Sequence, residues 1–214
     1  MRTIIINGSP KGNSKKCNSM FFAREFVRNM ENPCEIQCVA NQDAKELAQY
    51  IKPFDTVLFI LPLYIHAMPG ILMDFIEFLE PTKDKSKSMG FIVQAGFIET
   101  SQERFLKAYF EGLTARLNYR YLGTVAKGEA AGIYMYPKMF KKVFRQLNRL
   151  GVEFERNHAF DRDIVKKMEK PYKLSKPMLI LLTIVDKFGL ANIGWHKKLK
   201  ENNAFDKRLE KPFL

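Results

Sequence analysis

The sequence is poor in cysteine. Its 214 residues include three, Cys17, Cys34 and Cys38, and no two of them form a CxxC pair. Zinc ribbons, four-thiolate iron–sulfur clusters and disulfide scaffolds all need more cysteines than this. Free thiols in a chain without a secretory segment are typical of the cytosol, so we expect a cytoplasmic protein.

Long apolar runs are also absent. The longest, residues 178–185, is interrupted by Thr183 and ends at Asp186-Lys187. A bilayer span needs about 20 apolar residues. We therefore expect no transmembrane segment.

The sequence lacks the common nucleotide-binding and catalytic motifs. GxxxxGK[ST] does not occur, and Gly8 and Gly12 do not have the spacing of GxGxxG. No Ser-His-Asp constellation and no cluster of metal-ligating residues is recognisable. We accordingly predict no catalytic side chain and no metal.

Negative charge is scarce in the C-terminal part of the chain. The formal net charge is +12, and residues 131–214 alone hold 19 Lys/Arg against 9 Asp/Glu. Such a segment can attract nucleic acid, anionic lipid or an anionic substrate, or it can form solvated helix faces. Because the basic residues are scattered and no recognition motif is present, we expect no nucleic-acid partner.

Strand and helix patterns alternate along the chain. Short apolar runs bounded by turn residues predict strands, and apolar residues at helical spacing predict helices. The expected strands are 3–6, 35–39, 56–61, 89–94 and 122–126, and the expected helices are 18–30, 43–51, 69–79, 101–117, 137–154 and 177–189. This order predicts a parallel sheet covered on both faces, with ligands bound beyond the carboxyl ends of the strands.

The first strand–helix connection, residues 7–19, has the character of an anion site. It ends at a helix N-terminus, where backbone N–H groups and the helix dipole favour negative charge, and Asn18 or Ser19 is the expected N-cap. Lysines and short polar side chains fill the loop. The alternative is a polar connection with an ordinary helix cap.

The residues Ile-Asn-Gly-Ser-Pro-Lys, followed by Asn-Ser at a helix start, resemble the FMN-phosphate loop of the flavodoxin-like NAD(P)H-dependent oxidoreductases, which include flavin, quinone and azo reductases. The resemblance implies that Ser9, Lys11, Asn18 and Ser19 bind the FMN phosphate. Because the loop is longer than usual, the Asn-Ser pair at 13–14 could replace the pair at 18–19. The family also implies a three-layer α/β/α sandwich with strand order 2-1-3-4-5.

The loop after the third strand, residues 62–69, resembles the family segment that lies along the isoalloxazine ring of the flavin. The resemblance implies contacts from Pro62, Leu63 and Tyr64, with His66 as a weaker candidate. A surface histidine and a core tyrosine are the structural alternatives.

The loop after the fourth strand, residues 94–99, resembles the segment beside the pyrimidine side of the ring. There the resemblance implies Gln94, Gly96 and Phe97. Gly96 permits a close approach of the backbone to a planar ligand. The alternative is a plain strand–helix turn.

The resemblance covers residues 1–155 as an FMN-binding domain and leaves residues 156–214 as a basic helical extension. It implies FMN and NAD(P)H as cofactors, hydride transfer to a small-molecule electron acceptor, and a homodimer. Two other functions stay open: an electron carrier without NAD(P)H activity, and a basic nucleic-acid-binding module.

Overall fold

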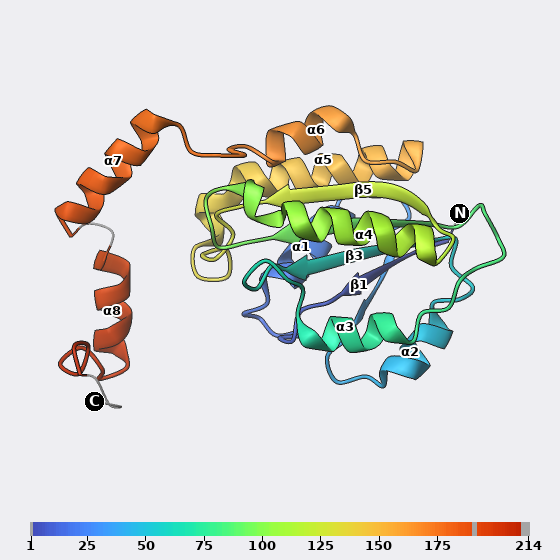
Figure 1. Ribbon diagram of the computed structural model, residues 1–214, viewed down its shortest axis with the longest axis horizontal. Coiled ribbons are helices and arrows are strands. Elements are labelled where there is room, and N and C mark those ends of the chain that lie inside the picture. The colour runs from blue at the N-terminus through green and yellow to red at the C-terminus, as the bar shows by residue number, and fades with distance from the viewer. Residues whose placement is uncertain (1, 190–191, 211–214) are drawn as a thin grey trace. The chain divides into compact units, whose positions relative to one another are not determined.

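The computed structural model describes residues 2–189 and 192–210 (Figure 1). By its internal contacts the chain divides after Lys173 into two units, which are described separately. The assignment of residues 1–155 and 156–214 to different roles stays a prediction, because contacts do not show what each part does.

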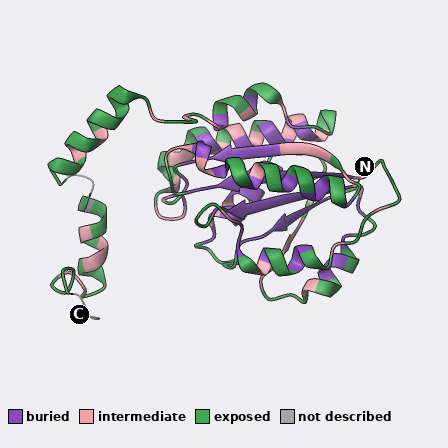
Figure 2. Ribbon diagram, in the orientation of Figure 1, coloured by how far each residue is buried: buried purple, intermediate pink, exposed green. Residues whose placement is uncertain are grey.

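The first unit contains a five-stranded parallel sheet (Figure 1). Its strands are β1 (Thr3–Asn7), β2 (Glu35–Cys38), β3 (Thr56–Pro62), β4 (Ser88–Gln94) and β5 (Arg120–Lys127). The order β2-β1-β3-β4-β5 confirms the predicted topology. Every residue of β3 and β4 is buried (Figure 2), which explains why these strands read as continuous apolar runs.

Helices cover both faces of the sheet, which confirms the three-layer prediction. The helical elements of this unit are α1 (Asn18–Val27), α2 (Ala44–Tyr50), α3 (Gly70–Glu77), the 3₁₀ turn η1 (Thr100–Glu103), α4 (Arg104–Arg116), the 3₁₀ turn η2 (Pro137–Phe140), α5 (Lys141–Asn157) and α6 (Arg162–Met168). One apolar core lies against α2, α3 and α4, and the other against α1, α5 and α6.

Two details differ from the sequence prediction. The N-cap of α1 is Cys17 rather than Asn18 or Ser19, and no side chain caps this helix. The helix α6 was not predicted from the sequence, because its seven residues are too few to show a clear period. Asp161 caps α6 by accepting a hydrogen bond from the Ile164 N–H at 2.8 Å.

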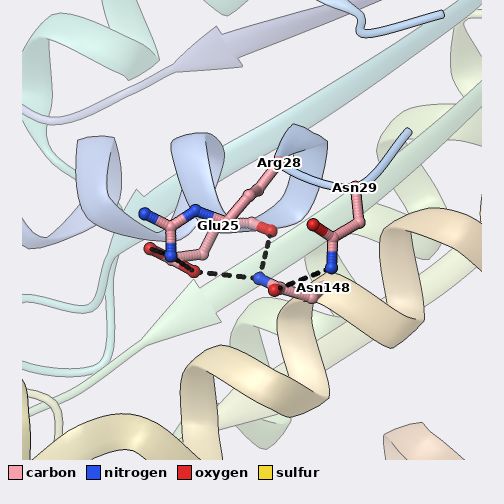
Figure 3. A network of polar contacts seen from close by, with 4 residues as sticks. All are labelled: Glu25, Arg28, Asn29 and Asn148. Carbon is pink, nitrogen blue, oxygen red and sulfur yellow. Dashed lines mark hydrogen bonds and ion pairs between the residues drawn. The ribbon is translucent and has the colours of Figure 1, made fainter. Parts of the chain in front are cut away.

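The helices α1 and α5 approach unusually closely at Gly151. A Cβ atom there would lie 1.8 Å from the Phe26 carbonyl oxygen, so only glycine fits. Beside this contact, Asn148 donates to the Glu25 carbonyl oxygen at 2.7 Å and to the Glu25 carboxylate at 2.9 Å (Figure 3). This polar network fixes how α5 lies along α1.

The second unit contains α7 (Lys176–Lys187) and α8 (Ile193–Glu201). The helix α7 agrees with the predicted helix at 177–189, but none of its residues is buried. Within the described ranges, no helix combines the length and hydropathy required to cross a bilayer.

Candidate functional site

The three loops that the sequence singles out converge at the carboxyl edge of the sheet. Pro62 and Gln94 are register partners at the ends of β3 and β4. The Leu63 N–H donates to the Gln94 carbonyl oxygen at 2.8 Å, and the Gly8 N–H donates to the Ile60 carbonyl oxygen at 3.0 Å. The loops after β1, β3 and β4 therefore start from adjacent strands and lie side by side.

Asn7, the last residue of β1, organises the loop that follows it. Its side-chain oxygen accepts from the Ser9 N–H at 3.1 Å, and its amide nitrogen donates to the Gly12 carbonyl oxygen at 2.9 Å. Gly12 has φ +50°, a conformation that favours glycine. Sequence reasoning assigned Asn7 no role, although an asparagine directly before a loop is a frequent signal of such local hydrogen bonds.

The start of α1 is open to an anion. Its first turn contains no acidic residue, and no side chain supplies a cap for its N–H groups. Lys11, Lys15 and Lys16 in the preceding loop are exposed. A helix N-terminus with unused N–H donors and surrounding lysines favours a bound phosphate.

The predicted phosphate ligands have different environments. Ser9 is buried, and its hydroxyl oxygen accepts from the Lys11 N–H at 3.3 Å. Ser19 is buried as well, and its hydroxyl accepts from the Gln94 side-chain amide at 3.5 Å. Asn18 binds the segment after β5, donating to the Ala130 carbonyl oxygen at 2.8 Å. The structure thus brings Ser19 and Gln94 together, whereas Asn18 holds a neighbouring loop.

The alternative pair is also engaged in local contacts. The Asn13 side-chain oxygen accepts from the Arg24 guanidinium at 2.8 Å, and the Ser14 hydroxyl oxygen accepts from the Lys16 N–H at 3.2 Å. Both residues are exposed. The choice between the pairs at 13–14 and 18–19 stays open.

The loop after β3 folds back on itself in a tight turn. Tyr64 and Ala67 exchange two backbone hydrogen bonds of 2.8 and 3.0 Å. Between them, Ile65 and His66 adopt positive φ values of 46° and 67°. A β-branched residue in this conformation is strained, and such strain concentrates at functional sites. This turn could not be predicted from the sequence, because Ile65 is a residue that such turns disfavour.

The turn presents side chains selectively. Tyr64 is 45% exposed, whereas Pro62 and Leu63 are buried and can offer a ligand only their backbone. Burial raises the pKa of the Tyr64 hydroxyl, and nearby Cys17 at the start of α1 adds to the rise. The imidazole of His66 contacts the Gln102 carbonyl oxygen at 3.2 Å.

The loop after β4 is fastened to the segment that follows β5. The Ala95 N–H donates to the Lys127 carbonyl oxygen at 2.9 Å, and the Glu129 N–H donates to the Phe97 carbonyl oxygen at 2.7 Å. A Cβ atom on Gly128 would lie 2.6 Å from that same Phe97 oxygen. Gly128, which sequence reasoning missed, therefore allows the two backbones to approach.

The predicted residues of this loop face solvent in part. Phe97 is 52% exposed, and Gly96 is exposed too. Around Gly96, the nearest atom to an added Cβ would be the Ala131 Cβ at 3.4 Å, an ordinary contact. The contacts around Gly96 therefore do not by themselves require glycine at this position.

Glu103 is a buried acid that the sequence did not reveal. It lies in η1 with no exposed surface, and neither carboxyl oxygen has a hydrogen-bond partner within the described chain. Burial raises its pKa to about 9, so it is protonated at neutral pH. From the sequence alone, Glu103 would be expected at the surface, because acidic residues in short turns are usually exposed.

Comparisons with known proteins identify the fold. Among solved structures, an NADPH-quinone reductase from P. pentosaceus superposes with a TM-score of 0.56 at 16% identity, covering 71% of this chain and 98% of that one. The fold is flavodoxin-like. No family model matches the sequence, and no match is found among curated proteins.

Two further structures share this flavodoxin-like fold. An NADH:FMN oxidoreductase in its apo form has a TM-score of 0.53 at 14% identity, covering 83% of this chain and 94% of that one. The general stress protein 14 of Treponema denticola, solved in complex with FMN, has a TM-score of 0.53 at 12% identity, covering 79% of this chain and 98% of that one.

Proposed function

We propose that this protein is an FMN-dependent NAD(P)H oxidoreductase that reduces a small-molecule acceptor such as a quinone, flavin, nitro or azo compound. The observation that carries the proposal is the convergence of three loops at one edge of a flavodoxin-like sheet. One loop offers an open helix N-terminus with lysines. The other two expose the aromatic side chains of Tyr64 and Phe97.

The start of α1 would hold the FMN phosphate. First-turn N–H groups, Ser9 and Lys11 supply the donors and the positive charge, and Asn7 keeps the loop in the required shape. Ser19 and Gln94 support this site from beneath, since their side chains bond to each other inside the fold.

The flavin ring would lie between the turn after β3 and the loop after β4. Tyr64 and Phe97 offer partly exposed aromatic faces, and the exposed backbone at Gly96 permits a close approach of the ring. When bound, FMN supplies the redox chemistry: NAD(P)H, a proton and a quinone give NAD(P)⁺ and a hydroquinone. The chain's part is to bind and orient the cofactor and to leave one ring face accessible.

The structural relatives support this proposal. One protein is described as an NADPH-quinone reductase, another as an NADH:FMN oxidoreductase, and a third was solved with FMN. Their fold is shared with this chain, and the loop residues described above give that fold the donors that FMN needs.

An absorbance spectrum of the purified full-length protein tests the proposal. We expect flavin bands near ~370 and ~450 nm and their anaerobic bleaching by NADPH or NADH. If the flavin stays oxidised, the protein is an electron carrier rather than an NAD(P)H-dependent enzyme. If the purified protein is colourless and retains RNA at low salt, it is a nucleic-acid-binding module instead.

A matched pair of variants locates the phosphate. Lys11→Gln removes a charge from the loop after β1, and Lys85→Gln removes one from an exposed position between α3 and β4, at the opposite edge. We expect the first to weaken FMN binding several-fold and the second to leave it unchanged. Equal affinities in the two variants would argue against this loop.

We further propose that the protein acts as a homodimer in the cytoplasm. The support for the dimer is α7, where Ile180 is 62% exposed and Leu181 is 53% exposed. An apolar helix of this kind is stable in water only when it is covered. Light scattering of the full chain and of a chain ending at Lys173 tests this: the dimer mass should appear only with the full chain.

A further inference from the structure

A second anion-attracting feature lies at the carboxyl end of β5, apart from the start of α1. It is a cavity of about 460 Å³ lined by four lysines from different segments. Lys127 ends β5, Lys142 lies in the first turn of α5, Lys167 in the last turn of α6, and Lys170 follows α6. The convergence of lysines from separate segments is a property of the fold, not of any run in the sequence.

Little negative charge balances this cavity. Its lining contains one carboxylate, Glu129. Among the described residues, none of the four lysine ammonium groups lies within ion-pair distance of an acid. Because like charges gathered in one hollow repel one another, an incoming anion is attracted there.

Lys127 is the most buried of the four lysines. The residue is 8% exposed, whereas Lys142, Lys167 and Lys170 are exposed. Burial lowers the pKa of Lys127, the positive charge of Lys142 adds to the fall, and Glu129 and Glu103 oppose it. Because burial disfavours the charged form of Lys127, an anion in the cavity would stabilise its positive charge.

The cavity also has an apolar part. Met139 and Phe140 of η2 and Val143 of α5 line it together with the polar Gln146. Its volume lies within the usual range for small-molecule pockets. The cavity therefore suits a molecule that combines an anionic group with an apolar or aromatic body.

The cavity adjoins the loop after β4. The Lys127 carbonyl oxygen accepts from the Ala95 N–H at 2.9 Å, and the Glu129 N–H donates to the Phe97 carbonyl oxygen at 2.7 Å. Residues of the cavity are thus hydrogen-bonded to the loop that would flank the flavin ring.

We propose that this lysine-lined cavity binds the anionic group of a small aromatic molecule that exchanges electrons at the flavin site. Electron exchange at the flavin site rests on the proposed function. Binding of an organic anion rests on the cavity alone. A negatively charged acceptor and the 2′-phosphate of NADPH share this chemistry, and the experiment separates them.

Two double variants with the same net charge test the cavity in the full-length protein. Lys142→Gln with Lys167→Gln removes two lining lysines, and Lys141→Gln with Lys166→Gln removes their exposed neighbours on the same two helices. The probe is 1,4-naphthoquinone-2-sulfonate, and its uncharged counterpart is 2-methyl-1,4-naphthoquinone. Calorimetric titration measures binding without turnover.

We expect the lining variant to bind the sulfonate at least tenfold more weakly than the control variant, with equal affinities for the uncharged quinone. If the sulfonate is unaffected but the preference for NADPH over NADH is lost in the lining variant alone, the anionic group is the nucleotide phosphate. Equal weakening of sulfonate binding in both variants overturns the proposal, because long-range charge would then be the cause. No change in either variant, in sulfonate affinity or in the preference for NADPH over NADH, overturns it as well.

The outcome is separable from that of the proposed function. Flavin absorbance is recorded on the same samples, and the lining lysines lie outside the loop after β1. A protein without flavin whose sulfonate binding still depends on the lining lysines would refute the oxidoreductase and keep the anion site. A flavoprotein whose sulfonate binding does not depend on the lining lysines would keep the oxidoreductase and refute the anion site.

Discussion

Replacing Glu103 by glutamine should change how the stability of this protein depends on pH. The wild-type carboxyl is fully buried without a hydrogen-bond partner among the described residues, and its pKa is raised from 4.5 to about 9. Burial is the main cause. Glu169 adds to the rise, while Lys107 and Lys127 oppose it. Glutamine has nearly the same shape but does not titrate.

The sign follows from proton binding. Between about pH 4.5 and 9 the folded protein holds a proton on Glu103 that the unfolded chain has lost, so rising pH favours unfolding. One proton corresponds to slightly more than 1 kcal/mol per pH unit. From pH 6 to pH 8, this group alone should lower the free energy of unfolding by about 3 kcal/mol.

Urea unfolding at pH 6, 7 and 8 measures the effect. We expect the pH slope of Glu103→Gln to be flatter than that of the wild type by about one proton. Glu111→Gln makes the same chemical change at an exposed position of α4 and should keep the wild-type slope. Parallel slopes for wild type and Glu103→Gln would refute the reasoning that Glu103 is held protonated.

Three glycine- and turn-related predictions follow from contact geometry. Gly151→Ala places a Cβ atom 1.8 Å from the Phe26 carbonyl oxygen and should lower the free energy of unfolding in urea by about 3 kcal/mol. Gly112→Ala, with nothing within 4 Å of the added Cβ, should raise it by up to about 1 kcal/mol. Similar values for both variants would contradict this. Gly128→Ala should displace the loop after β4 and raise the Kd for FMN about tenfold, as fluorescence titration would report; an unchanged Kd would separate this loop from the cofactor. Ile65→Asn should raise the free energy of unfolding by about 1 kcal/mol, because asparagine tolerates positive φ; a loss of stability would show that the exposed isoleucine has a partner.

Much of the fold could be predicted from the sequence because the signals are local. Residues 56–61 form an apolar run that stops at Pro62, and the structure has β3 there, ending at that proline. The alternation of such runs with helical periods already implies a parallel sheet covered on both faces. The strand order followed from the resemblance to a known family, and the observed sheet confirms it.

The site was predicted only as three loops at three strand ends. Each loop is a continuous segment that directly follows a strand, so its position in the fold follows from the order of the elements. What each side chain does there depends on distant partners: Asn18 bonds to a carbonyl 112 residues away, and Ser19 to an amide 75 residues away. No local pattern carries such information.

The sequence by itself determined the layered architecture and the edge of the sheet where the candidate site lies, since both follow from hydrophobic period and chain order. Only the tertiary structure decided which charges are buried or gathered. Glu103 and Lys127 look like surface residues in the sequence, and the four lysines of the cavity lie on separate segments. Burial and charge density are sums over neighbours in space, and those neighbours exist only once the chain has folded.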